Sequence, residues 1–128
     1  MILAICEGSS MATPEVRGQL DVATGTVGTI WIEPAGAVAS LVVAHGAGAG
    51  MDHPFLAGFC RAIAEEAVAT MRFNFPYAER GRRSPDTERV LRETWPAPFD
   101  AAKAAGDRPV LVVTGPWVQE PARGTTVP

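Results

Sequence analysis

The chain has 128 residues, of which 47% are apolar and 20% are charged, and its formal net charge is −3. This length allows one domain with a substantial core. A net negative charge gives no electrostatic basis for binding nucleic acid or an anionic membrane, so we expect neither partner. Cys6 and Cys60 lie far apart without metal-ligand spacing. We therefore expect free thiols in a reducing cytoplasm, and neither a metal nor a cofactor.

The first elements expected along the chain are two strands. Residues 1–10 have the character of an N-terminal extension, and we place the start of the folded part at residue 11. A short strand is expected over 16–20. After a turn at 23–25, residues 26–33 alternate between apolar and polar side chains, as in a half-buried strand.

The next elements are a buried strand and an amphipathic helix. Residues 41–44 form a continuous apolar run, which is typical of a strand covered on both faces. A helix is expected over 54–68, with Asp52 as its N-cap and Pro54 in its first turn. Its apolar residues recur at helical spacing, namely Phe55, Phe59, Ile63 and Ala67.

The second half of the chain continues the alternation of strands and helices. A buried strand is expected over 68–73, followed by the arginine-rich connection RFNFPYAERGRRSPD. A helix is expected from Asp86, interrupted by two prolines and resumed over 99–105. Residues 110–113 are a third buried strand. This order predicts an α/β fold whose sheet is mostly parallel, with helices on both faces and an antiparallel N-terminal edge.

The stretch LVVAHGAGAGMDHPF places three glycines directly after a buried strand. Such spacing indicates that the backbone comes close to a ligand. A Walker phosphate loop is excluded, because no lysine follows. The dinucleotide fingerprint is a near miss, because its third glycine would fall on Met51 or His53. A nucleotide-binding protein therefore stays as an alternative.

The third possibility for this loop is an oxyanion hole. In α/β-hydrolases a backbone N–H in the loop after the third strand points at the developing oxyanion. The glycines let the main chain approach the substrate. Here His45 opens the loop, and we expect it to brace Gly46 and Gly48.

These motifs together resemble a family. LVVAHGAGAGMDHPF, followed by RFNFPYAERGRRSPD and a tryptophan-bearing helix, resembles the small α/β-hydrolase-like family related to dienelactone hydrolases. That family also includes testis-expressed proteins and a subunit of a histone-acetylation complex. The resemblance covers roughly residues 15–113. It implies a partial α/β-hydrolase fold, an acyl substrate of small-molecule size, and the Ala47 N–H as oxyanion donor.

The resemblance breaks after the strand at 110–113. A G-x-S-x-G turn with the nucleophilic serine is expected there, followed by the catalytic acid and histidine. This chain reads VLVVTGPWVQEPARGTTVP instead, and no serine lies in such a turn. We expect a folded part over 11–115, a disordered and non-native tail over 116–128, and an inactive chain. A non-catalytic interaction module is the alternative.

The codons for residues 116–120 suggest a cause. Read one base earlier, they encode Ser, Thr, Ala or Pro, then Met, Leu or Val, then Gly. Ser-Met-Gly is thus available in the neighbouring frame, and we hypothesise a single-base shift near Thr114. Finding no such codons on resequencing would reject that hypothesis.

Several other polar residues have a structural and a functional interpretation. We expect His53 to lie in the cap region of its helix or at the surface. Arg80, Arg82 and Arg83 could bind an anion, although a solvated loop is favoured. Arg72 and Asn74 end a strand at the edge where open α/β sheets bind ligands, so a polar role is expected there.

Overall fold

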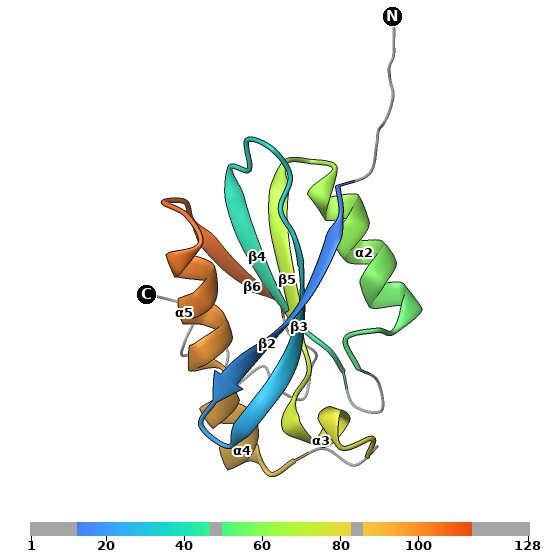
Figure 1. Cartoon of the computed structure of the whole chain (residues 1–128), viewed down its shortest axis with the longest axis vertical. Coiled ribbons are helices and arrows are strands. Elements are labelled where there is room, and N and C mark those ends of the chain that lie inside the picture. Colours follow the sequence, from blue (N-terminus) through green and yellow to red (C-terminus); the bar gives the residue numbers. More distant parts are fainter. Residues whose placement is uncertain (1–12, 47–49, 83–85, 114–128) are drawn as a thin grey trace, which may run out of the picture.

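The computed structural model describes residues 13–46, 50–82 and 86–113. Five strands and four helices follow one another along these residues (Figure 1). In chain order they are β2 (Glu15–Val22), β3 (Gly25–Ile32), β4 (Ala39–Ala44), α2 (Pro54–Ala64), β5 (Val68–Phe73), α3 (Pro76–Glu79), α4 (Glu88–Thr94), α5 (Pro96–Ala104) and β6 (Val110–Val113).

The strands form one mixed sheet in the order β2-β3-β5-β4-β6. β2 pairs with β3, and β3 with β5, in antiparallel fashion. β4 lies parallel to both of its neighbours, β5 and β6. The expected antiparallel N-terminal edge is therefore confirmed. Two of the four strand pairings are parallel and two are antiparallel, so the sheet is mixed, and β3 alone among the described strands runs against the other four.

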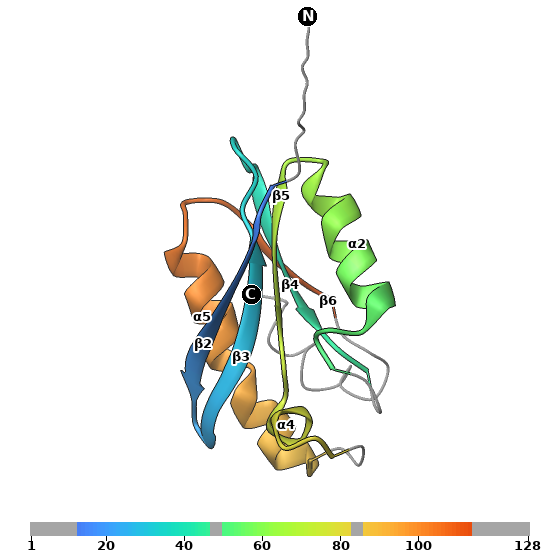
Figure 2. The ribbon, with the colours of Figure 1, turned by 45° about the vertical axis from the view of Figure 1, so that its right-hand side comes forward.

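Helices cover both faces of this sheet. Figures 1 and 2 show α2 on one side and α4 with α5 on the other. Successive residues of β4 alternate between the two layers: Val43 packs beside Cys60 of α2, and Val42 lies in the cluster that contains Trp95. This alternation explains why residues 41–44 read as a continuous apolar run, since both faces of the strand are buried.

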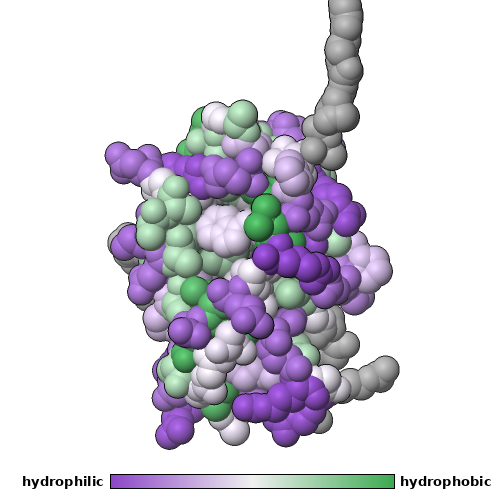
Figure 3. All heavy atoms as spheres, in the orientation of Figure 1, coloured by the Kyte–Doolittle hydropathy of each residue, from purple (hydrophilic) through white to green (hydrophobic). Residues whose placement is uncertain are grey.

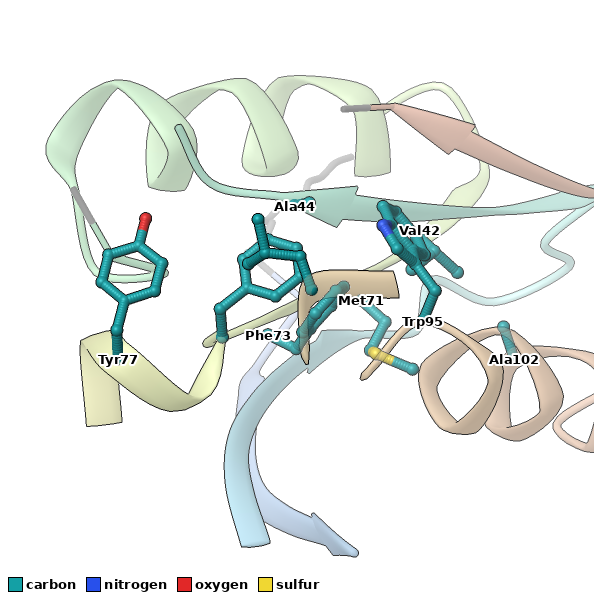
Figure 4. Packing of buried hydrophobic residues seen from close by; sticks show 9 residues of the cluster. Val42, Ala44, Met71, Phe73, Tyr77, Trp95 and Ala102 are labelled. Carbon is teal, nitrogen blue, oxygen red and sulfur yellow. The ribbon is translucent and has the colours of Figure 1, made fainter. Parts of the chain in front are cut away.

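The larger core cluster lies between the sheet and α4–α5. Figure 4 shows Trp95 packed close to Val42 and Met71 of the sheet. The rings of Trp95 and Phe73 meet edge to face at 5.4 Å. Trp95 is 1% exposed and joins α4 to α5, so it anchors both helices to the sheet.

Helix α2 differs from its prediction at both ends. Its N-cap is His53, whose Nδ1 accepts a hydrogen bond from the Phe55 N–H at 3.1 Å, so the assignment of the cap to Asp52 is wrong. The helix ends at Ala64 instead of residue 68. Ala67 has a φ of 61°, and this left-handed residue turns the chain into β5.

The buried face of α2 also differs from the predicted one. Phe55 is 72% exposed, and the buried positions are Ala57, Cys60 and Ala64. Small side chains at these positions let the helix approach the sheet closely. The prediction that Phe55 belongs to the buried apolar face of this helix is therefore wrong.

The other boundaries agree more closely with the sequence. β5 and β6 have the predicted limits. α4 starts at Glu88 with Thr87 as its N-cap, two residues after the predicted start. α5 begins at Pro96, because the prolines occupy its first turn, where an N–H is not needed.

β6 is more exposed than its sequence predicted. It was predicted as a buried strand, but Leu111 is 57% and Val113 37% exposed. Both residues lie opposite β4 residues that pack beneath α2, and among the described residues α2 does not extend over β6. The predicted extension at 1–10 and tail at 116–128 lie outside the described residues.

Candidate functional site

The candidate site lies at the carboxyl ends of β4 and β6. Val43 and Val113 are register partners in these parallel strands, so both strands end at the same edge of the sheet. His45 follows β4 directly. Open α/β sheets bind their ligands in a crevice beyond the carboxyl ends of their strands. We refer to residues 45–53 as the glycine loop; Ala47 and Gly48 lie outside the described residues.

His45 is fully buried and both of its ring nitrogens are engaged. Nε2 accepts a hydrogen bond from the Phe75 N–H at 3.0 Å, and Nδ1 donates to the Gly46 carbonyl at 3.0 Å. These two partners fix the neutral tautomer with its proton on Nδ1. Burial lowers the pKa of His45, although the hydrogen bond to Gly46 opposes that shift. Neither nitrogen is available as a base or metal ligand in this arrangement.

The Gly46 carbonyl has a second donor, the hydroxyl of Tyr77 at 3.4 Å. Tyr77 comes from α3, at the left of Figure 4. Its ring meets that of His45 edge to face, with centroids 5.5 Å apart. Burial, together with the charge of Asp86, raises the pKa of Tyr77 to about 12, so its hydroxyl keeps its proton and remains a donor. The backbone after His45 is thus held from two sides.

A cavity of about 170 Å³ opens beside this backbone. His45 and Gly46 form one wall, and the beginning of α2 forms the other with His53, Phe55 and Leu56. The lining is mostly apolar.

Asp52 does not cap α2 as predicted, and His53 takes that position instead. Asp52 forms an ion pair with Arg17 of β2. A hydrogen bond from Arg17 lowers the pKa of Asp52, and partial burial opposes this. His53 caps α2, in agreement with the cap-region interpretation.

Arg72 and Asn74 contact the glycine loop. The Arg72 Nε donates to the Met51 carbonyl and the Asn74 Oδ1 accepts from the Met51 N–H, each at 2.8 Å. At the end of β5 the two polar side chains therefore bind the protein's own backbone at Met51. Tyr77 and Glu79 were not among the residues predicted from the sequence to form the site. Aromatic residues stand at every second position here, namely Phe73, Phe75 and Tyr77. This alternation could have predicted that Tyr77 is buried with the other two.

Arg80 and Arg82, which follow α3, pair with Asp86. Arg80 lies 4.0 Å and Arg82 3.6 Å from its carboxylate, which also accepts from the Tyr77 N–H at 2.8 Å. Arg83 lies outside the described residues. The carboxylate of Asp86 is 6% exposed, so these arginines serve a buried internal partner.

The described residues offer no nucleophile at this edge of the sheet. Ser40 is the one serine in residues 13–46, 50–82 and 86–113, and it is buried in β4, where it accepts from Arg108 at 2.7 Å. Cys60 is a buried free thiol, and burial raises its pKa. Within the same ranges no group of three His, Cys, Asp or Glu side chains is arranged to hold a metal ion. No helix there is long and apolar enough to cross a membrane.

A model of the alpha/beta hydrolase domain matches residues 37–116, which is more than half of the chain. The chain belongs to this family. Its fold is a partial α/β-hydrolase fold, and the family explains the order of the sheet. No curated protein matches the sequence significantly.

Several solved structures resemble this α/β-hydrolase chain. A serine hydrolase without a lid from Xanthomonas campestris has a TM-score of 0.71 at 17% identity, and the match covers 88% of this chain and 56% of that one. A serine hydrolase homologue from Coxiella burnetii gives 0.70 at 14%, covering 92% and 59%. Dienelactone hydrolase from Anabaena variabilis gives 0.66 at 14%, covering 82% and 53%. The chain thus spans little more than half the length of these proteins.

Proposed function

We propose that this chain is the N-terminal part of a serine hydrolase domain and that it supplies the oxyanion loop for cleavage of esters or related acyl bonds. The domain family is shown by the match over residues 37–116. The proposal adds a role for the glycine loop. In this role the Ala47 N–H donates to the negative oxygen that develops during acyl transfer.

One observation carries the proposal, namely the register of β4 and β6. Val43 lies opposite Val113, so His45 starts its loop beside the point where β6 ends. In α/β-hydrolases the nucleophile sits on the turn after a strand at the carboxyl edge of the sheet. β6 therefore ends at the edge of the sheet where the glycine loop begins.

The Gly46 carbonyl provides independent support. His45 and Tyr77 both donate to this oxygen from the protein interior. A trans peptide unit carries its C=O and the following N–H on opposite sides. The Gly46 carbonyl is held toward His45 and Tyr77. This supports the proposal that the N–H of the same peptide unit, that of Ala47, faces outward.

The intact mechanism that we propose is attack by serine, base catalysis by histidine, and stabilisation of the oxyanion at Ala47. The 128-residue chain has no G-x-S-x-G turn, and both of its histidines precede β6. Loss of a nucleophile costs several orders of magnitude in rate. We therefore expect this polypeptide to be inactive alone.

The cavity at the glycine loop supports a small acyl substrate. Its lining by Phe55 and Leu56 favours an apolar group next to the scissile bond. The buried free thiol of Cys60 is compatible with a reducing compartment, and we place the protein in the cytoplasm.

A non-catalytic interaction module is the second candidate, because Leu111 and Val113 leave apolar surface exposed at the sheet edge. Replacing the corresponding loop of the Xanthomonas campestris serine hydrolase by residues 45–53 tests the first candidate against it. A catalytic loop should retain measurable hydrolysis of short p-nitrophenyl esters. Loss of all activity in a correctly folded graft would favour the second candidate.

The chain alone provides a separate test. Its four serines are Ser9, Ser10, Ser40 and Ser84. We expect no labelling of the purified chain by a fluorophosphonate probe. Covalent labelling of one of these serines, located by mass spectrometry, would contradict the proposed absence of a nucleophile.

A further inference from the structure

Met51, near the end of the glycine loop, has both of its backbone polar groups bound by side chains of one neighbouring segment. Its N–H donates to the Asn74 Oδ1, and its carbonyl accepts from the Arg72 Nε, each at 2.8 Å. Arg72 belongs to β5 and Asn74 follows it directly. Loop backbone is commonly satisfied by water or by its own turn. Here the fold devotes two side chains to a single residue.

An arginine is energetically unfavourable at the buried position of residue 72. Its side chain is 2% exposed, and within the described residues its Nη1 has no hydrogen-bond partner. Burying a guanidinium with incomplete pairing is unfavourable compared with an apolar side chain. Stability alone therefore does not account for this residue. Its Nη2 lies 3.1 Å from the Glu15 carboxylate on edge strand β2, which also pairs with Arg61 of α2.

Asn74 is itself held in one orientation. Its Nδ2 donates to the Glu79 Oε2 at 2.8 Å, and its backbone N–H donates to the Gly28 carbonyl at 3.1 Å. The same Glu79 oxygen accepts from the Gly28 N–H at 2.7 Å. Since an amide has its donors on nitrogen only, the bond to Glu79 turns the Asn74 Oδ1 toward Met51.

We propose that Arg72 and Asn74 are positioning residues that hold the C-terminal end of the glycine loop through Met51, and that Glu15 on β2 keeps Arg72 in place. His45 holds the other end of the same loop through Gly46. The reason for this arrangement rests on the proposed function, because an oxyanion donor must be placed before the reaction. The N-terminal hairpin thereby becomes part of the site.

Hydrogen exchange resolved by residue on the full 128-residue chain tests the role of Asn74. Asn74→Ala removes the acceptor, so the Met51 amide should exchange about tenfold faster or more, while the Met71 amide within β5 should not change. Asn74→Asp combined with Glu79→Gln keeps the acceptor oxygen and moves the amide donor to residue 79, so this double variant should restore the protection of Met51. Equal acceleration of both amides in Asn74→Ala, or no restoration in the double variant, would overturn the proposal.

Glu15→Gln tests the link from the hairpin without touching the loop. It leaves Arg72 buried without its carboxylate partner, so the amides of Met51 and His53 should exchange several-fold faster. Asp21→Asn is the matched control, because Asp21 lies on the same strand and bonds only to Thr26 among the described side-chain contacts. It should leave these amides unchanged. Equal effects of the two substitutions would overturn the role of Glu15.

These measurements concern the chain itself and need no enzymatic turnover. If the loop graft is inactive but the exchange results hold, the positioning is correct and the proposed function fails. If the graft is active while Asn74→Ala leaves Met51 protected, the function stands and the positioning role fails.

Discussion

The imidazole of His45 joins the end of β4 to the segment that follows β5. Its Nε2 accepts from the Phe75 N–H at 3.0 Å, while its Nδ1 proton is used by Gly46. A protonated imidazole has no acceptor, so acid must break the bond to Phe75. The link between the two strands therefore exists only in the neutral form of His45.

The stability of the fold should depend on pH through this residue. Burial lowers the pKa of His45 below its ordinary 6.5. Below pH 6.5 the unfolded chain binds a proton that the folded chain does not, so the free energy of unfolding should fall as the pH decreases toward the folded pKa. The slope from one such group is at most about 1.4 kcal/mol per pH unit. Above pH 6.5 this contribution is constant.

Denaturant titrations between pH 7.5 and 5 measure this dependence. His45→Gln removes the titrating group, so its variant should lose the decrease that begins near pH 6.5 and be less stable at pH 7.5. His53→Gln is the control for the other histidine and should keep the decrease. An unchanged pH profile in His45→Gln would contradict the assignment.

Gly28 lies close to two side chains where β3 passes the loop and α3. A Cβ at this position would lie 2.8 Å from the Met51 Cε and 3.0 Å from the Glu79 Oε2. Gly28→Ala should therefore destabilise the fold by about 1 kcal/mol, as overpacking does. Thermal or urea unfolding measures the change.

Gly58 in α2 is the matched control for that substitution. A Cβ there would meet no atom within 4 Å, and alanine is the better helix former. Gly58→Ala should stabilise the chain by roughly 0.5–1 kcal/mol. Both substitutions restrict the unfolded chain in the same way, so the opposite signs would report the native contacts. Equal effects would refute the close approach at Gly28.

The exposed apolar side chains of β6 should promote self-association. In Figure 3 the apolar residues of one face form small patches between hydrophilic ones. Leu111, by contrast, is exposed on an edge strand with unpaired backbone groups among the described residues. Leu111→Thr keeps strand propensity and should lower the concentration-dependent association seen by light scattering or sedimentation.

Val112 on the same strand gives the control for Leu111. It packs against the core cluster beneath α5. Val112→Thr should therefore destabilise the fold without reducing association. If the two substitutions lower association equally, the exposed face of β6 is not its cause.

The strands were predictable because their signal is local. Residues 68–73 are mostly apolar and residues 110–113 are entirely so, and the bounds of both strands are confirmed, although β6 is not buried as predicted. The cap and the face of α2 were not, because they depend on tertiary contacts. Asp52 is drawn to Arg17 on β2, and His53 is left to cap the helix.

The candidate site was predictable only in part. The glycines indicated the loop after β4 as the candidate site, and the alternation of strands and helices along the chain indicated an α/β fold. The tautomer of His45 depends on Phe75, thirty residues along the chain, and Arg72 needs Glu15 at a separation of 57. Such pairings follow from the register of the sheet, so they cannot be predicted from the spacing of residues along the chain.

The central claim is that the backbone N–H of Ala47 stabilises an oxyanion, and the loop graft in the Xanthomonas campestris hydrolase tests it most directly. In that graft Ala47→Pro removes this N–H and also fixes the backbone φ of residue 47, whereas Ala47→Ser keeps the N–H, so the fold of both variants is checked by circular dichroism. We predict that Ala47→Pro lowers kcat by about 10²-fold or more while Ala47→Ser stays close to the parent graft. Equal kcat values for the proline and serine variants would contradict the claim.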